Sequence, residues 1–165
     1  MTPLVRNAMI LLCATYGVEM VLRYLAGRSG MGKSRILDEL RSVALDSGQH
    51  VLSGQAATET GRPFQVWRRP LRELVFLSEL SLYEASVLVG IVPEVRALFS
   101  ETVPEAPKLD GPAAKMRLAS VLIGLLARQT RPVLFLLEDL QWAGAESLAL
   151  LGGLAAELPK LSVSV

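Results

Sequence analysis

One string of eight residues constrains this chain more than any other: Gly27-Arg28-Ser29-Gly30-Met31-Gly32-Lys33-Ser34. It fits the pattern G-x-x-x-x-G-K-[ST], in which glycines let the backbone curl so that successive N–H groups point into one concavity. Such a concavity suits an anion, and the amino end of a following helix adds a favourable field. The string therefore predicts a phosphate-binding loop between a strand and a helix.

Several residue types in this loop have a defined chemical task. The Lys33 ammonium can reach the β- and γ-phosphates of a nucleotide, and the Ser34 hydroxyl can bind Mg²⁺. The residues that we expect to bind the nucleotide are Gly27, Gly30, Met31, Gly32, Lys33, Ser34 and Arg35. The alternative is a glycine-rich turn with a stray lysine.

The flanking sequence matches the context that the loop needs. Residues 18–26 are apolar and partly β-branched, which predicts a strand. Residues 33–45 place their apolar side chains on one helical face, which predicts a helix with Ile36, Leu37, Leu40, Val43 and Ala44 inward.

The rest of the chain reads as alternating helices and strands. Residues 1–17 are hard to place, and we expect either a short helix beside the sheet or a frayed end. We expect the first helix to end at Ser47-Gly48, with the glycine in a left-handed cap. Further strands are expected at 49–54 and 133–139, and residues 159–165 are expected to begin another strand. Helices are expected at 64–80, 81–90, 92–100, 113–129 (with Met116 inward) and 145–158. The neighbouring Arg68, Arg69 and Arg72 indicate a solvated basic face or, alternatively, an arginine cluster facing a nucleotide or a partner.

A second chemical element follows about 100 residues after the loop. Five apolar residues, 133–137, precede Glu138 and Asp139. This predicts a central parallel strand covered on both faces, with two carboxylates at its carboxyl end, where open α/β sheets bind ligands. One acid can hold Mg²⁺, directly or through water, and the other can polarise an attacking water. The alternative is a solvated acid that caps the next helix. Trp142 is expected to pack at the strand-to-helix turn.

Composition excludes several classes of protein and of binding site. A chain of 165 residues suggests one domain, and a net charge of +1 points to no particular partner. No basic block indicates nucleic-acid contact. Cys13 and His50 are single, which excludes a disulfide framework and a metal cage of several histidines. No run is long enough to cross a membrane. We expect a cytoplasmic protein, because chemistry on ATP belongs there, and we take the apolar stretch 8–14 as too short for a secretory signal.

Three strings together resemble a known group. They are Gly-Met-Gly-Lys-Ser-Arg, Leu-Leu-Glu-Asp-Leu-Gln-Trp-Ala and the Ser-Leu-x-Leu-Leu of the following helix, and Arg62-Pro63-Phe64 also fits. They are similar to regulatory AAA/STAND-type ATPase domains of bacteria, the origin-recognition-like AAA domains fused to LuxR-type regulators, serine/threonine kinases or nucleotide cyclases. The resemblance covers residues 20–165.

The resemblance implies a P-loop α/β three-layer sandwich. Its sheet would be mostly parallel, with an extra strand between the two strands that carry the Walker A (27–34) and Walker B (133–139) motifs. ATP and Mg²⁺ would bind at Gly32, Lys33 and Ser34. By position, Glu138 is the metal-side acid, directly or through water, and Asp139 is the catalytic acid that activates water. The opposite assignment stays open, because Asp is commoner than Glu on the metal side.

Three departures from this family pattern stand out. Gly144 replaces an acid that usually follows the tryptophan, and residues 1–17 lack the usual amino-terminal segment. The chain also stops at Val165, where the strand with the γ-phosphate sensor should begin, and the helical lid would follow that strand. We therefore expect residues 18–165 to form an ATPase domain that is incomplete at its carboxyl end, either a fragment or a degenerate product.

Four functions are compatible with these patterns. The first is an ATP-binding, slowly ATP-hydrolysing switch module that acts with the other domains of a signalling regulator, with nucleotide-dependent self-association left open. The second is a nucleotide-binding domain that does not hydrolyse. The third is a small-molecule kinase, which the acid pair followed by Leu-Gln-Trp fits less well. The fourth is an inactive fragment. We expect no direct contact with nucleic acid and no membrane association.

Overall fold

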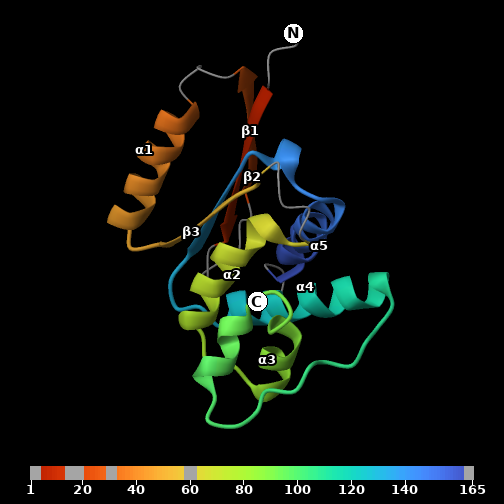
Figure 1. Ribbon diagram of the computed structural model, residues 1–165. Helices are drawn as coiled ribbons and strands as arrows, with labels where there is room; N and C mark the ends of the chain where they lie inside the picture. Colours follow the sequence, from red (N-terminus) through yellow and green to blue (C-terminus); the bar gives the residue numbers. More distant parts are fainter. Residues whose placement is uncertain (1–4, 14–20, 29–32, 58–62, 162–165) are drawn as a thin grey trace.

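The computed structural model describes residues 5–13, 21–28, 33–57 and 63–161 (Figure 1). Side chains are described within 35–57 and 63–155. The elements follow in the order β1 (Val5–Cys13), β2 (Val21–Arg28), α1 (Lys33–Asp46), β3 (His50–Gln55), α2 (Gln65–Phe76), α3 (Leu82–Leu88), the 3₁₀ helix η1 (Pro93–Leu98), α4 (Gly111–Ala127), β4 (Val133–Glu138), the 3₁₀ helix η2 (Leu140–Trp142) and α5 (Ala145–Leu161).

The sheet has the strand order β2-β1-β4-β3. β3 pairs parallel with β4, whereas β1 pairs antiparallel with both β2 and β4. It follows that β2, β4 and β3 run in one direction and β1 alone runs in the other. The predicted α/β fold with a mostly parallel sheet is confirmed. The carboxyl ends of β2, β3 and β4 lie at one edge, which we call the carboxyl edge, and the amino end of β1 lies there too.

The position of β1 corrects our expectation for residues 1–17. A short helix or a frayed end was expected, but Val5–Cys13 is a strand paired on both sides. An apolar run of this length does not distinguish a buried strand from a buried helix by periodicity, and the partners of β1 settle the matter. β1 lies between β2 and β4, where the resemblance implied an extra strand. Residues 1–4 and 14–17 lie outside the described residues.

Helices cover both faces of the sheet. The alternation along β4 sends Leu134 and Leu136 toward α1, where they pack with Leu37 and Ala44. On the other face, α2, α4 and α5 form the larger core with the remaining apolar residues of the strand, Val133, Phe135 and Leu137. Figure 1 shows α1 on one side of the sheet and α5 on the other. All five apolar residues of β4 are buried, as the uninterrupted apolar run predicted.

The helix α2 approaches β3 unusually closely. A Cβ atom at Gly54 would collide with the backbone oxygen of Val66 and lie 3.0 Å from Cγ of Pro70, so only glycine fits there. Trp67 directly follows Val66, and its indole is fully buried and meets the Phe135 ring edge-on, with centroids 5.6 Å apart. Its Nε1–H donates to the backbone oxygen of Ser147 at 3.0 Å, which ties α2 to α5.

Most predicted helices are present, with corrected limits. α2 stops at Phe76 rather than at residue 80, because the Ser78 hydroxyl bonds back to the Leu74 carbonyl and Ser81 starts a new capping box. The segment expected as a helix at 92–100 is the 3₁₀ helix η1, which has a proline at its start. Gly48 has φ +74, which confirms the predicted left-handed helix end.

Three apolar side chains that we expected to be inward are exposed. Met116 is 74% exposed because the buried stripe of α4 runs through Leu118, Leu122 and Leu125 on its other side. Ile36 and Val43 are 42% and 63% exposed, since α1 rests on the sheet through a narrower stripe. The strand expected to start at residue 159 is also wrong for 159–161, where α5 continues, because a short alternation is a weak signal beside a long helix. Residues 162–165 lie outside the described residues.

Candidate functional site

The strand, loop and helix expected around the glycine string are present. β2 ends at Arg28 and carries Gly27, and α1 starts at Lys33, so Lys33, Ser34 and Arg35 occupy its first turn. The predicted residues Gly30, Met31 and Gly32 lie outside the described residues. The first turn of α1 is therefore placed at the carboxyl edge, where free helix N–H groups favour an anion.

Arg35 is directed along its own helix. Its Nε donates to Glu39 Oε1 at 3.1 Å, and the side chain is 85% exposed. In this structure, its guanidinium therefore serves a surface ion pair between successive turns of α1.

The two predicted acids lie at the same carboxyl edge but differ in their surroundings. Glu138 is the last residue of β4 and is half-buried. Asp139 follows it with the backbone in the left-handed region, φ 57 and ψ 35, and is 7% exposed. Asp is among the few residues that adopt this conformation readily. The chain thus turns sharply after β4 and leaves a buried carboxylate at the turn.

Two glutamine amides hold the Asp139 carboxylate. Nε2 of Gln55 donates to Oδ2 at 2.7 Å, and Nε2 of Gln141 donates to Oδ1 at 3.3 Å. The parallel pairing of β3 with β4 supports this contact, since Gln55 is the register partner of Glu138, and the Ala56 N–H donates to the Glu138 carbonyl at 3.0 Å. The Asp139 side chain makes no capping bond to η2, the short helix that directly follows it.

Sequence reasoning missed both glutamines. Gln55 lies just outside the strand expected at 49–54 but is the last residue of β3, and the available signal was a polar residue at the carboxyl end of a short apolar strand. Gln141 stands within the Leu-Gln-Trp string but was given no role. Trp142, expected to pack at the turn, is instead 44% exposed, because η2 turns it away from the core that its neighbour Leu140 enters.

Comparison with known families decides the class of the domain. A family model described as AAA ATPase domain matches residues 12–165. The chain belongs to the AAA ATPase domain family. The match spans both the glycine loop and the acid pair, and membership implies ATP binding. Searches among curated proteins and among solved structures returned no match.

The oxygen donors of this AAA ATPase domain fit Mg²⁺. A hard cation prefers oxygen ligands, and Mg²⁺ in nucleotide sites takes one or two protein oxygens together with phosphate oxygens and water. Among the described residues, no group of three or more His, Cys, Asp or Glu side chains could form a closed metal cage. A hydroxyl at position 34 and a carboxylate at the end of β4 are the kinds of ligand that an open Mg²⁺–phosphate site requires.

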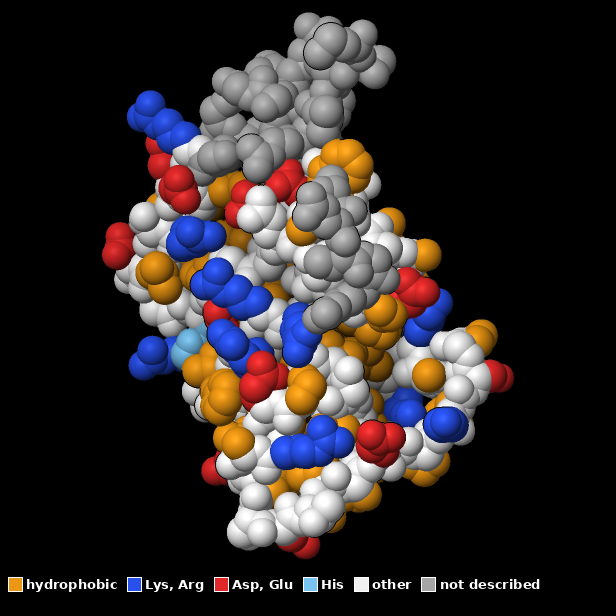
Figure 2. All heavy atoms as spheres, in the orientation of Figure 1, with side chains coloured by type: hydrophobic (Ala, Val, Ile, Leu, Met, Phe, Trp, Pro, Cys, Tyr) orange, Lys and Arg blue, Asp and Glu red, His pale blue; other side chains and the backbone are white. Residues whose placement is uncertain are grey.

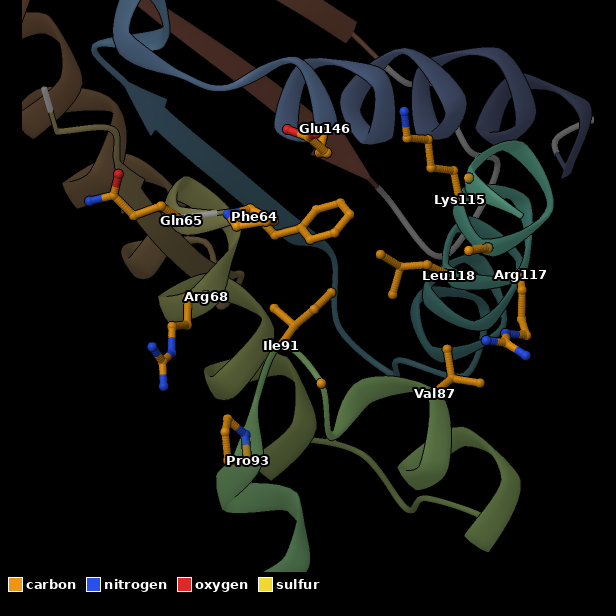
Figure 3. A pocket seen from close by; sticks show the side chains of 14 residues that line it. Phe64, Gln65, Arg68, Val87, Ile91, Pro93, Lys115, Arg117, Leu118 and Glu146 are labelled. Carbon is orange, nitrogen blue, oxygen red and sulfur yellow. The ribbon is translucent and has the colours of Figure 1, made fainter. Parts of the chain in front are cut away.

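The AAA ATPase domain also has a cavity away from these residues. It measures about 910 Å³ and lies among α2, α3, α4 and α5, on the sheet face opposite α1. Figure 3 shows Phe64, Ile91 and Leu118 pointing into the same space, with Glu146 and Lys115 at its α5 side. Among the described lining residues there is none of the predicted nucleotide-binding or catalytic residues, so the cavity is not the expected phosphate site.

The arginines of α2 form a solvated face, and one of them, Arg68, also lines the cavity described above. Arg68, Arg69 and Arg72 are all exposed, and Nε of Arg69 pairs with Glu73 at 3.0 Å. Figure 2 shows Lys and Arg side chains gathered in the middle of the face drawn, with acidic side chains among them. No helix in the described part of the AAA ATPase domain is long and apolar enough to cross a membrane.

Proposed function

We propose that this AAA ATPase domain binds Mg–ATP at the carboxyl edge of its sheet and hydrolyses it slowly. The observation that carries the proposal is the buried Asp139 carboxylate, held by Gln55 at the edge where α1 begins. A carboxylate fixed by two amides has a defined direction, which is what orienting a water molecule requires. An aspartate that only capped a helix would not need a partner on the neighbouring strand.

Each residue of the proposed site has a separate task. The backbone N–H groups of the glycine loop, including Gly30, Met31 and Gly32, surround the phosphates, and Lys33 offsets their charge. The Ser34 hydroxyl and the half-buried Glu138 hold Mg²⁺, the latter directly or through water. Asp139 accepts the proton of the water that attacks the γ-phosphate in line. When bound, Mg²⁺ would supply positive charge beside the phosphates and so reduce the charge that the protein must offset.

We also propose the setting in which this ATPase works. The Walker strings resemble those of ATPase domains fused to signalling or transcription regulators, which supports a role as a nucleotide-dependent switch in a larger regulator. Because β1 is paired into the same sheet as β2 and β4, the proposed nucleotide domain includes residues 5–161 rather than starting at residue 18.

Calorimetry with Mg–ATP tests the binding part of the proposal. We expect micromolar binding by the wild-type chain and none measurable by Lys33→Ala, because the lysine charge is lost. The matched control is Lys108→Ala, an exposed lysine in the loop before α4, which should bind as the wild type does. A folded wild-type chain that binds no Mg–ATP would contradict the proposal.

Phosphate release tests the hydrolytic part. We expect Asp139→Asn to reduce kcat at least about 100-fold while ATP affinity stays within about threefold, because a general base contributes mainly in the transition state. If Asp139→Asn hydrolyses ATP as fast as the wild type, Asp139 is not the base. If the wild type binds ATP but shows no single-turnover hydrolysis, the domain is a nucleotide-binding switch without chemistry.

A further inference from the structure

The cavity on the sheet face opposite α1 has the size and the walls of a small-molecule site. Its volume of about 910 Å³ falls within the range of roughly 300–1,000 Å³ that is usual for ligand pockets. Figure 3 shows the apolar side chains of Phe64, Ile91 and Leu118, which come from three separate parts of the chain, pointing into the same space. Walls of this kind favour a ligand with an apolar body, because its burial removes apolar surface from water.

Phe64 is held at this cavity in a backbone conformation that few residues adopt. It lies directly before α2 with φ 58 and ψ 22, and among the described residues only Asp139 is another non-glycine residue with positive φ. For a bulky side chain this conformation costs free energy and persists only where the surrounding packing holds it, as it often does at functional sites. The half-buried ring packs on the core and also lines the cavity. The conformational cost thus falls on a residue that forms the wall of the cavity.

The charged side chains that line the cavity are mostly cationic. They are Arg68, Lys115, Arg117 and Glu146. None of the three cations forms an ion pair with a side chain that the structure describes. Three cations and one carboxylate leave the described lining with an excess of positive charge. Charge complementarity therefore favours an anionic ligand over a neutral or cationic one.

Lys115 is the cation best placed to meet that anion. Its side chain is half-buried, and Figure 3 shows it at the α5 side of the cavity. The two arginines are directed elsewhere: Figure 3 shows Arg68 pointing away from the Phe64 ring, and Nη1 of Arg117 donates to the backbone oxygen of Pro107 at 2.8 Å. An ammonium above an apolar cavity would fix the orientation of an acid whose body lies below it.

We propose that this cavity binds a small organic acid, with the apolar body of the acid among Phe64, Ile91 and Leu118 and its carboxylate against Lys115. The apolar walls supply most of the affinity, and the cation selects the acid over neutral and cationic molecules of the same shape. The described lining includes none of the predicted nucleotide-binding or catalytic residues, so this site is additional to the proposed ATP site and does not depend on it.

Three ten-carbon probes separate the head group from the apolar body. Decanoate, decanol and decylammonium have the same tail, and calorimetry measures their binding to the full chain at neutral pH, at concentrations below those at which they aggregate. We expect decanoate to bind at least about tenfold more tightly than decanol, and decylammonium to bind more weakly than either. Equal affinities for the three probes would overturn the proposal, because they would indicate apolar binding without recognition of the acid. A folded chain that binds none of them would overturn it as well.

Two substitutions at the cavity should change the affinity for decanoate in opposite directions. Lys115→Gln removes the cation and should weaken decanoate binding about tenfold, whereas Glu146→Gln removes the carboxylate and should strengthen it about twofold. Decanol binding should stay within about twofold in both variants, because decanol has no charge. The matched control is Lys108→Gln, the same change at an exposed lysine outside the cavity, which should bind decanoate as the wild type does. Wild-type affinity for decanoate in Lys115→Gln would overturn the proposal.

Phe64→Gly tests the apolar part of the site with little risk to the fold. Glycine adopts a φ of 58 without the cost that phenylalanine has, which offsets part of the lost packing. We expect this variant to weaken decanoate and decanol by a similar factor, about tenfold, because the ring contacts only the tail. Circular dichroism establishes that the variant is folded. A folded Phe64→Gly with wild-type affinity for both probes would show that they bind elsewhere.

Two further measurements identify a different occupant of the cavity or a different site for the probe. Lys33→Ala should bind decanoate as the wild type does, and a loss of decanoate binding in this variant would place the probe in the nucleotide site. It would overturn this proposal and leave the proposed ATP binding intact. Sedimentation reports on self-association: a wild type that binds no probe and forms dimers which Phe64→Gly abolishes would show that the cavity holds a second copy of the chain.

Discussion

At the scale of single residues, Asp139 in the turn after β4 has the least common combination of backbone conformation, burial and hydrogen bonding. Asp139 combines a left-handed backbone, near-complete burial and two amide donors. A buried carboxylate must have hydrogen-bond partners, and each of these donors also restricts its direction. In the proposed hydrolysis, the Gln55 amide on the neighbouring strand would therefore position Asp139, and its loss should affect turnover more than binding.

We expect Gln55→Leu to lower kcat for ATP about tenfold, because the 2.7 Å bond to Asp139 is lost, while the ATP affinity stays within about twofold. Single-turnover hydrolysis and calorimetry measure the two quantities. Gln49→Leu is the matched control: it makes the same change just before the other end of β3, where the side-chain oxygen of Gln49 is buried without a partner. Equal losses of turnover in both variants would contradict the positioning role.

Gly54 is the residue whose size limits the packing of α2. We expect Gly54→Ala to reduce the free energy of unfolding by about 1–3 kcal/mol, because the added methyl group meets the Val66 carbonyl and that backbone cannot rotate away. Urea denaturation measures the change. Gly152→Ala is the control, since its Cβ would enter open space on α5 and alanine favours a helix, so stability should be unchanged or higher. A Gly54→Ala chain as stable as the wild type would show that α2 can shift.

At the scale of elements, an ion pair between Glu84 of α3 and Arg128 at the end of α4 joins the two helices. The Glu84 carboxylate accepts from the backbone and hydroxyl of Ser81 and from Nη2 of Arg128 at 2.7 Å, and its side chain is only 13% exposed. Burial alone would raise the pKa of Glu84, but the hydrogen bonds from Ser81 and Arg128 together hold that pKa below its usual value. The ionised form is thus the one that the folded chain stabilises.

This arrangement predicts a pH dependence of stability. A carboxyl whose pKa is lowered by folding contributes fully above its usual pKa, near 4.5, and the contribution is lost as the pH falls through the lower folded value. We expect the free energy of unfolding to fall less steeply between pH 6 and pH 3, roughly the range over which acids titrate, for Glu84→Gln than for the wild type. At pH 7, Glu84→Gln should be less stable by about 1 kcal/mol.

Denaturation curves at several pH values test this prediction. Glu79→Gln is the control, because this exposed acid lies in the same turn before α3 and its variant should follow the wild-type curve. If the free energy of unfolding depends on pH with the same slope in Glu84→Gln and in the wild type, the contacts of Glu84 with Ser81 and Arg128 do not form in solution.

Elements with local signals could be predicted from the sequence, and those defined by distant partners could not. The apolar periodicity of α1 and the uninterrupted apolar run of β4 can be recognised in consecutive residues. The strands and helices that carry the two Walker motifs were therefore expected near their observed limits. The strand β1 and the Gln55–Asp139 bond depend on which strands pair and in what register. No periodicity within Val5–Cys13 or around Gln55 contains that information.

At the scale of the whole molecule, the two tryptophans report on different parts of the structure. Trp67 is fully buried against Phe135, whereas Trp142 is 44% exposed close to Asp139. We expect iodide to quench one emission component of the wild type, and Trp142→Phe to leave a blue-shifted emission that iodide does not quench. Mg–ATP should change the emission of the wild type but not that of Trp142→Phe. Quenching that persists in Trp142→Phe would show that Trp67 is accessible and that the core is loose.

The place of β1 also sets an order of events during synthesis of the chain. β1 and β2 are close together in the sequence and pair antiparallel, so this pairing can form early, from local contacts. β4, the other partner of β1, is made much later, so its pairing closes a very long loop and should be slow. In the described sheet, β2 is bonded to β4 only through β1. The strand that leads into the glycine loop and the strand that carries the acids are thus joined only when β4 pairs with β1. In the proposed function, the nascent chain would therefore not bind ATP before this late step.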